Sequence, residues 1–288
     1  MIEEKKEISN LSNNNSNEIE DNSKASNTNS LSLKNSTNNE PIIQVKNLTV
    51  QYDDRVIIDN ISFDIMRGEI FMIVGGSGCG KSTVLRQIIG LEIPIEGEIL
   101  INGEDICKAT GKDKVHILNK FGVLFQSSGL FASMTLAENI ALKLETSTNL
   151  TNSQILELIN IKLTSVGLAG YESFLPSEIS GGMKKRAALA RAMALDPPIL
   201  CFDEPSSGLD PVTAATMDEL IKELNSALGT TMVVVSHDLD GVINTAQRVI
   251  MLDKDAKGII AEGAPKELKE MKENKKVYDF FNRIPTSI

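Results

Sequence analysis

The chain has 288 residues, of which 41% are hydrophobic, so it is long enough for one large domain or two small ones with a buried core. Its formal net charge is -10, and an acidic chain lacks the basic surface with which nucleic-acid-binding proteins displace counterions, so we expect no nucleic-acid partner. The three cysteines, Cys79, Cys107 and Cys201, form no CxxC pair, which argues against a zinc site or a disulfide framework.

Residues 1–40 differ in composition from the rest of the chain, because they are rich in Asn, Ser and charged residues and show no apolar periodicity. Such a segment cannot bury enough apolar surface to offset the entropy of ordering, so we predict a disordered tail. The segment has no signal-peptide core, and Glu3, Glu4 and Glu7 argue against a transit peptide. A plain linker is favoured over a regulatory tail.

The pattern from Pro41 onward is that of short β-strands. Residues 42–52 alternate as a half-buried strand, and residues 61–70 follow after a turn at Asp53 and Asp54. Residues 96–106 predict a second hairpin, with Asn102 and Gly103 at its turn. These segments predict a small antiparallel layer.

Four short apolar runs then each lead into a loop or helix, at residues 70–75, 122–126, 198–204 and 231–237. Continuous apolar strands that alternate with helices are typical of a parallel sheet covered on both faces. Ligands of such sheets bind beyond the carboxyl ends of the strands. The runs are much shorter than the ~20 residues that span a bilayer, so no transmembrane segment is expected.

Helical patterns dominate two further stretches. No strand pattern occurs between about residues 127 and 197, and we expect a helical subdomain there, inserted into a domain that covers residues 41–264. Ser180 is placed to cap the helix that follows it. Residues 265–288 predict a C-terminal helical extension that packs Tyr278, Phe280 and Phe281 on the body of the protein.

Residues 75–83, GGSGCGKST, match the phosphate-binding pattern GxxxxGK[ST] between a buried strand and a helix. Backbone N–H groups of this loop are expected to wrap phosphates, Lys81 to neutralise the β and γ oxygens, and the Ser82 hydroxyl to bind Mg²⁺. We also expect the amide dipoles to favour a thiolate at Cys79. The segment predicts a nucleoside triphosphate site formed by Gly75, Gly76, Ser77, Gly78, Cys79, Gly80, Lys81, Ser82 and Thr83.

Two other strand ends carry candidate catalytic residues. Asp203 and Glu204 end an apolar strand, and we expect Asp203 to hold Mg²⁺ while Glu204 orients and polarises the attacking water. A structural acid pair is the alternative. His237 ends another strand, where it could hydrogen-bond a γ-phosphate, although a lone histidine is more often a satisfied core or surface residue.

The glycines after Ser180 raise the question of a second phosphate site, since a glycine-rich helix N-terminus offers free N–H groups to an anion. The 75–83 loop, Gln126, SGG at 180–182, ILCFDE at 199–204, SSGLD at 206–210 and His237 have the order and spacing of ABC-type ATPase subunits, over residues 42 to about 265. This resemblance implies an α/β P-loop NTPase with a mostly parallel central sheet, a small antiparallel β subdomain and a helical subdomain. It also implies ATP, Mg²⁺ and a head-to-tail homodimer.

The resemblance assigns further roles. In that family each SGG helix caps the ATP held by the other subunit, which makes Ser180, Gly181 and Gly182 trans ligands and places Asp210 at the same interface. Gln126 reaches both the Mg²⁺ and the helical subdomain. Tyr52 matches the position whose ring stacks on adenine, with a core tyrosine as the alternative. Met183 stands where this family usually has Gln, and a thioether cannot supply the hydrogen bonds of an amide.

A closer likeness exists to the ATPases of Mla-type lipid transporters, in which SGGMKKR is the common form of this motif. Residues 121–144, 180–197 and 203–215 carry it. The likeness implies an MlaE-like integral-membrane permease, an MCE-domain substrate-binding protein and a phospholipid or related hydrophobic cargo. It implies a peripheral position at the cytoplasmic face of the inner membrane.

Two other classes share the catalytic motifs. One is the ATPase of a polar-substrate importer, for amino acids for example, and the other is a soluble scaffold ATPase of iron–sulfur cluster assembly. Docking of a permease by Leu130, Phe131 and Met134 in the helical subdomain would favour a transporter, and cofractionation with membranes would exclude the scaffold. Catalytic motifs alone do not name the cargo.

Overall fold

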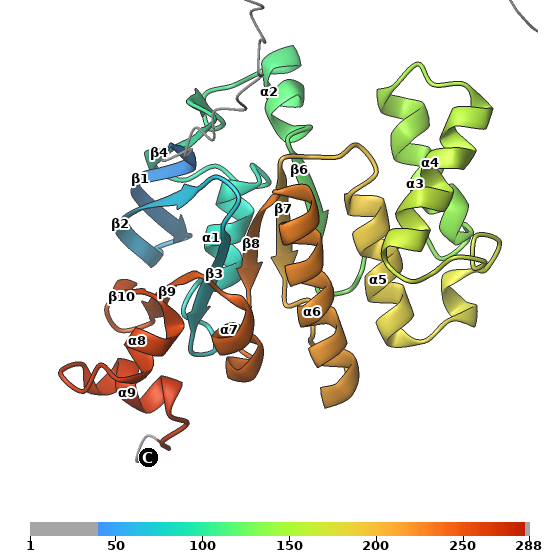
Figure 1. Cartoon of the computed structure of the whole chain (residues 1–288). Helices are drawn as coiled ribbons and strands as arrows, with labels where there is room; N and C mark the ends of the chain where they lie inside the picture. The colour runs from blue at the N-terminus through green and yellow to red at the C-terminus, as the bar shows by residue number, and fades with distance from the viewer. Residues whose placement is uncertain (1–39, 286–288) are drawn as a thin grey trace, which may run out of the picture. The chain divides into compact units, whose positions relative to one another are not determined.

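A computed structural model describes residues 40–285 of the protein (Figure 1). The disordered tail predicted for residues 1–40 falls almost entirely outside this described part, as do the last three residues. Between them, two sheets and the helices that cover them form the structure.

The larger sheet has six strands in the order β10-β9-β3-β8-β7-β6. Five are parallel, and β10 pairs antiparallel with β9 at one edge. These strands are β3 (Ile70–Gly75), β6 (Phe121–Leu124), β7 (Ile199–Asp203), β8 (Thr231–Val235), β9 (Arg248–Asp253) and β10 (Gly258–Gly263). Every residue of β3 and β8 is buried, as expected for inner strands covered on both faces. The mostly parallel sheet confirms the predicted fold class, whereas β9 and β10 were not predicted.

The smaller sheet is antiparallel, in the order β2-β1-β4-β5. Its strands are β1 (Pro41–Tyr52), β2 (Arg55–Met66), β4 (Glu96–Ile101) and β5 (Glu104–Asp105). The predicted turns are confirmed, because Asp53 has a φ of 50° and Asn102 and Gly103 have φ values of 51° and 81°. The second strand begins at Arg55 and not at Ile61, since the whole segment 55–66 pairs with β1.

Alternating side chains of β3 divide the interior into two cores. Phe71 and Ile73 pack with residues of the antiparallel sheet, such as Ile43, and with α1 (Lys81–Ile88). Met72 and Val74 point the other way and pack with helices α6 (Pro211–Leu228) and α7 (Leu239–Thr245). The period of two in a strand therefore anchors β3, and the loop that follows it, between both layers.

A group of helices lies beside β6, at the right of Figure 1, and comprises α3 (Leu136–Ser147), α4 (Asn152–Ser165) and α5 (Gly181–Ala192), with a short 3₁₀ turn at Pro176–Glu178. Thr135 and Thr151 begin α3 and α4 with complete capping boxes, in which the threonine hydroxyl and the acid or amide three residues later satisfy free backbone N–H groups. Helix α5 packs on β6 and α6 as well as on α3 and α4, which joins this group to the sheet.

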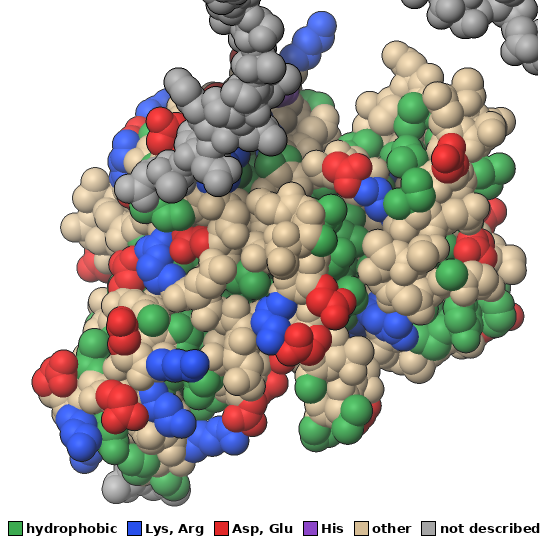
Figure 2. Space-filling view, viewed as in Figure 1, with side chains coloured by type: hydrophobic (Ala, Val, Ile, Leu, Met, Phe, Trp, Pro, Cys, Tyr) green, Lys and Arg blue, Asp and Glu red, His purple; other side chains and the backbone are tan. Residues whose placement is uncertain are grey.

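The remaining helices lie at the outside of the molecule. Helix α2 (Gly111–Leu118) follows the antiparallel sheet, and α8 (Pro265–Lys269) and α9 (Lys275–Phe281) end the described chain. Phe281 and Val277 are buried in the core, while Lys276 pairs with Asp253 and Asp255 at 2.9 Å each. Figure 2 shows basic and acidic side chains mixed over these C-terminal helices. No helix in residues 40–285 is both long enough and apolar enough to cross a bilayer.

The proposed boundaries at residues 41, 127, 197 and 264 stay predictions. Helices α3 to α5 lie within the range 127–197, and α8 begins at Pro265. Residues 40–285 lie in one compact unit, however, so these boundaries mark changes of local architecture within it.

Candidate functional site

The loop between β3 and α1 follows a path that only glycine allows at two positions. Gly75 has a φ of 142°, and a Cβ atom there would lie 2.3 Å from the backbone oxygen of Leu252. Gly80 has a φ of 101°, and a Cβ atom there would lie 2.7 Å from Ile58 Cδ1. The loop is formed by Gly75, Gly76, Ser77, Gly78, Cys79 and Gly80, and Lys81, Ser82 and Thr83 form the first turn of α1. The first N–H groups of α1 thus open toward the end of the parallel sheet, where an anion can accept them.

Lys81 folds back over this loop. Its ammonium group donates hydrogen bonds to the backbone oxygens of Gly75 and Gly76 at 3.0 and 3.1 Å. Phosphate oxygens are charged and therefore stronger acceptors than carbonyls. The ammonium group is positioned to exchange these carbonyls for phosphate oxygens without leaving the loop.

The thiol of Cys79 differs from our prediction. It is only 2% exposed and belongs to the core beneath the loop. Burial raises the pKa of this thiol, and the nearby charge of Lys81 offsets only part of the rise. The prediction of a thiolate was wrong, because burial in the core outweighs the backbone N–H groups of Cys79 and Lys81, which lower the pKa of the thiol.

Ser82 and Asp203 meet between α1 and the end of β7, where the Ser82 hydroxyl donates to the carboxylate at 2.8 Å. Gln126 follows β6, and its amide nitrogen donates to Ser207 Oγ at 3.3 Å. A hydroxyl, one carboxylate and an amide oxygen are the ligands that Mg²⁺ accepts when phosphate and water complete its octahedron. These residues therefore fit Mg²⁺ carried with a nucleotide, and the bound ion would neutralise phosphate charge.

Glu204 and His237 face each other across the ends of β7 and β8. A carboxylate oxygen of Glu204 contacts His237 Nδ1. Glu204 has a φ of 54°, in the left-handed region, and its N–H donates to the backbone oxygen of Val235 at 3.0 Å. The Glu204 side chain is 13% exposed and that of His237 is 64% exposed. The carboxylate is therefore mostly buried, whereas the imidazole is open to solvent. A carboxylate held in this way can accept a proton from water.

Helix α5 begins as predicted. Ser180 caps it by accepting the N–H of Met183 at 3.3 Å, and Gly182 lies so close to α6 that a Cβ atom would be 2.5 Å from Thr213 Cγ2. Ser180 and Gly181 at its N-terminus are exposed. Helix α5 as a whole packs with α3, α4, α6 and β6, whereas α1 packs on β3, β7 and β8. Within residues 40–285, no hydrogen bond joins Ser180 to the loop at 75–83.

Asp210 caps α6 beside this helix. It accepts the N–H groups of Val212 and Thr213 at 3.1 Å each, and the Thr213 hydroxyl also donates to it. The hydrogen bonds from Thr213 lower the pKa of the Asp210 carboxyl. Asp210, at the end of the partly exposed segment 206–210, is therefore fixed as the N-cap of α6.

Tyr52 ends β1 and is 40% exposed, so it is not a core tyrosine. Its hydroxyl donates a hydrogen bond to the Glu92 carboxylate. The Gln87 side-chain amide nitrogen donates to the same carboxylate at 3.1 Å. Partial burial and the Glu92 carboxylate raise the pKa of Tyr52. No sequence pattern pointed to Glu92, because its contacts join segments 40 residues apart. The ring is anchored at one end, as a stacking platform requires.

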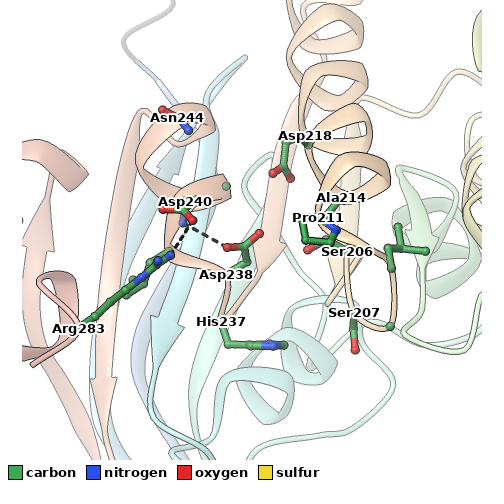
Figure 3. Close-up of a pocket in the computed structure, with 15 residues that line it drawn as sticks. Ser206, Ser207, Pro211, Ala214, Asp218, His237, Asp238, Asp240, Asn244 and Arg283 are labelled. Atoms are coloured by element: carbon green, nitrogen blue, oxygen red, sulfur yellow. Dashed lines mark hydrogen bonds and ion pairs between the residues drawn. The ribbon is translucent and has the colours of Figure 1, made fainter. Parts of the chain in front are cut away.

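A hollow of about 480 Å³ lies beside His237, between α6 and α7 (Figure 3). Asp218, Asp238 and Asp240 line it, and Arg283 is paired with Asp240 at 2.7 Å. Three carboxylates repel a phosphate, so this hollow is unsuited to a nucleotide.

Known proteins share this arrangement. Residues 58–207 match the family model described as ABC transporter. An intermembrane phospholipid transport system ATP-binding protein, MlaF, from Haemophilus influenzae is 43% identical over 230 residues, which are 80% of this chain and 86% of the relative. The chain belongs to the ABC transporter ATP-binding family. The MlaF protein of Escherichia coli K12 is also 43% identical, over 79% of this chain and 84% of the relative.

A third relative is named for a different substrate. The probable ribonucleotide transport ATP-binding protein mkl of Mycobacterium leprae is 44% identical over 198 residues, which are 69% of this chain and 57% of that protein. Proteins named for different cargoes are similarly identical to this chain, so the catalytic body does not define the cargo.

Solved structures share the fold. A dimeric ATP-binding cassette in a post-hydrolysis state, bound to ADP and Pi, superposes with a TM-score of 0.70 at 31% identity and covers 77% of this chain and 98% of its own. A subunit of the ABC transporter complex cbiONQ from Clostridium perfringens gives a TM-score of 0.73 at 26% identity and covers 85% and 99%. This ABC protein is an ATPase that uses ATP with Mg²⁺, which confirms the predicted fold, enzyme class and cofactors.

Proposed function

We propose that this ABC ATPase drives the transfer of phospholipid or a related hydrophobic molecule between membranes. The main evidence for this proposal is the 43% identity to the MlaF phospholipid transport proteins over 80% of the chain. The motif SGGMKKR supports it, because Met183 replaces the Gln of other ABC ATPases and matches the Mla-type form. Met183 is half-buried against the core, where a thioether packs well and an amide would need partners.

We infer that the subunits work as a homodimer. At the N-terminus of α5, Ser180 and Gly181 are exposed and Gly182 is buried against α6. The phosphate loop belongs to a separate part of the same chain. A second copy in head-to-tail orientation would bring the two together around ATP, with Asp210 at the contact. The dimeric cassette among the similar structures supports this arrangement.

Each half of the composite site has a distinct task in this proposal. The loop at 75–83 and Lys81 bind the phosphates, and Ser82, Gln126 and Asp203 hold Mg²⁺. Glu204 orients the attacking water and His237 hydrogen-bonds the γ-phosphate, while Tyr52 stacks on adenine. Binding of ATP would close the dimer, and hydrolysis would remove the shared ligand and let the subunits part.

The membrane partners are an MlaE-like permease and an MCE-domain substrate-binding protein, which would place this subunit peripherally at the cytoplasmic face of the inner membrane. The segment 127–135 supplies a contact for the permease. Phe131 is 49% exposed there, Met134 is half-buried, and Leu130 packs against the core. A hollow of about 470 Å³, lined in part by Met134 and Leu142, lies on the neighbouring face of α3.

The test is purification from native membranes followed by reconstitution into vesicles that contain a fluorescent phospholipid. We expect the permease to copurify and lipid to transfer in an ATP-dependent way, with a Glu204→Gln complex as the inactive control. Transport of a ribonucleotide or an amino acid without lipid transfer would contradict the proposal. Recovery of the protein away from membranes, with iron–sulfur assembly proteins, would identify the scaffold class instead.

A further inference from the structure

Lys185 is a buried lysine in the helix that carries the trans residues. It lies on α5, five residues after Ser180, and only 6% of it is exposed. Its neighbour Lys184 is more exposed and begins the same turn. Burial of an ammonium group is costly unless polar partners compensate, so the contacts of Lys185 indicate what it does.

Those contacts are two backbone carbonyls from distant segments. The Lys185 ammonium donates to the backbone oxygen of Gln126, after β6, and to that of Glu204 at 3.3 Å, after β7. The acceptors lie 59 and 19 residues away in the sequence. One side chain of α5 therefore joins the segment with the proposed Mg²⁺ ligand Gln126 to the segment with the proposed catalytic carboxylate.

The backbone that Lys185 holds is strained at Glu204. A φ of 54° is unfavourable for a residue with a Cβ atom, and such conformations persist where neighbours fix them. The Glu204 N–H is fixed by Val235 and its carbonyl by Lys185 and by the Ser207 N–H, at 3.2 Å. Removal of the ammonium group would leave this carbonyl with one partner fewer.

Electrostatics also favour a cation at this position. Burial lowers the pKa of Lys185, and the carboxylates of Asp203 and Glu204 act against that change. The cation in turn offsets the repulsion between these acids and an approaching nucleotide. The contacts and the charge of Lys185 both act on the same pair of segments.

We propose that Lys185 is a positioning residue that couples α5 to Gln126 and Glu204. When the partner's ATP engages Ser180, the displacement of α5 is transferred through Lys185 to the Mg²⁺ ligand and the catalytic carboxylate of its own subunit. This inference rests on the proposed composite dimer. In this inference, the hydrogen bonds of Lys185 connect the N-terminus of α5 to the proposed Mg²⁺ and catalytic residues of the same chain.

The test compares Lys185→Met, which keeps the length but removes the donors, with the matched control Lys184→Met. We expect Lys185→Met to lower kcat by about tenfold or more while the Kd for ATP–Mg²⁺ changes by less than about threefold. In hydrogen exchange, ATP should no longer protect residues 126–128 and 204–207. The Hill coefficient for ATP should fall toward about 1. Lys184→Met should match the parent in all of these, and Lys185→Arg should restore part of kcat.

The contrary outcomes are distinct. Parent-like kcat and parent-like exchange protection in Lys185→Met would overturn the role of Lys185 alone. A parent protein that turns over ATP without any dependence on pairing would overturn both this inference and the proposed dimer. If Lys185→Met does not fold, Lys185→Leu decides by the same criteria, because leucine also removes the donors and has a different apolar shape.

Discussion

At the scale of single residues, we expect Lys81 and Glu204 to act on different steps, so that their substitutions separate binding from chemistry. Lys81 is the side-chain cation of the phosphate loop, whereas Glu204 is held between Val235 and His237. Glu204→Gln should keep ATP affinity within about threefold of the parent and lower hydrolysis by about a hundredfold or more, because an amide cannot accept the proton. The ATP-bound dimer should then persist in size-exclusion chromatography.

Lys81→Ala should behave differently, with weaker nucleotide binding and no measurable hydrolysis, because the phosphate charges lose their side-chain counter-cation. Fluorescent-nucleotide titration distinguishes the two variants. Tight binding and normal turnover in Lys81→Ala would remove this loop from the mechanism. A Glu204→Gln protein that stays monomeric at saturating ATP would contradict the dimer.

For Cys79 the structure leads to the opposite of the reactive thiolate that the sequence predicted. Burial raises the pKa of its thiol, so the reactive thiolate is scarce, and the side chain is 2% exposed. Burial also raises the pKa of Cys107, but that side chain is only half-buried, so alkylation of the native protein at about pH 7 should leave Cys79 unmodified over the time in which Cys107 reacts. Mass spectrometry of peptides measures the order of reaction. Rapid labelling of Cys79 that ATP prevents would show that the loop opens in solution.

Sequence motifs predicted these residues unequally, for a physical reason. Lys81, Asp203 and His237 lie at the ends of strands or in a fixed spacing, so local sequence marks them. Lys185 and Glu92 are defined by hydrogen bonds to segments 59 and 40 residues away, and no local pattern carries such contacts. The Cys79 thiol was predicted from the loop dipoles alone, and the core beneath the loop outweighs them.

At the scale of elements, the packing of α6 against α7 places a carboxylate where it is partly desolvated. Asp218 lies so close to Gly241 that a Cβ atom there would be 2.5 Å from Oδ2, and burial and the charge of Asp238 raise the pKa of Asp218 to about 6. Lys222 opposes the rise and Glu219 adds to it. The protonated form is favoured in the fold, so the stabilising contribution is complete below the unfolded pKa and is lost as pH rises through about 6.

Asp218→Asn should accordingly have a larger free energy of unfolding in urea than the parent at about pH 7.5. The difference should be on the order of 1 kcal/mol after allowance for partial exposure. The difference should shrink as the pH falls toward about 4, where the parent carboxyl is itself protonated. Glu223→Gln is the control, since Glu223 is exposed on the same helix and takes no part in the pKa rise of Asp218. An advantage that is equal at both pH values would assign the effect to packing and not to charge.

The elements themselves were predicted where periodicity was strong. The buried runs of β3, β7 and β8 and the capped helix α5 lie where the sequence indicated. Strand β9, RVIMLD, carries a comparable apolar run but was not recognised, and β10 is an edge strand with glycine at both ends. Edge strands carry weaker patterns, because only their inner neighbours constrain them.

At the scale of the whole molecule, two cores meet at the parallel sheet, and the helices beside β6 extend the second core outward. This group of helices carries the proposed trans residues of α5, and the exposed Phe131 lies just before α3, so in our proposal one body would face both the partner ATPase and the permease. Sequence alone could not establish which apolar residues of segment 127–135 are exposed. Leu130 packs inward and Phe131 does not, although both are large and apolar.

Phe131→Asp therefore tests the permease contact. Asn139 holds the Phe131 backbone through hydrogen bonds to its N–H and oxygen, at 2.8 and 3.2 Å, so the segment should stay folded when the exposed ring is replaced. We expect ATP affinity and the melting temperature to stay near those of the parent. Copurification with the permease should fall by about tenfold or more, because a charge in an apolar contact is costly.

Leu156→Asp is the matched control for Phe131→Asp, since Leu156 is 59% exposed on α4 of the same group of helices but lies outside the proposed contact. The control should retain both the permease and lipid transfer, whereas Phe131→Asp should lose them together. An unfolded Phe131→Asp protein would show that the ring supports the helical group. A folded variant that still binds the permease and transfers lipid would move the docking surface away from segment 127–135, because an unpaired carboxylate buried in an apolar contact is costly.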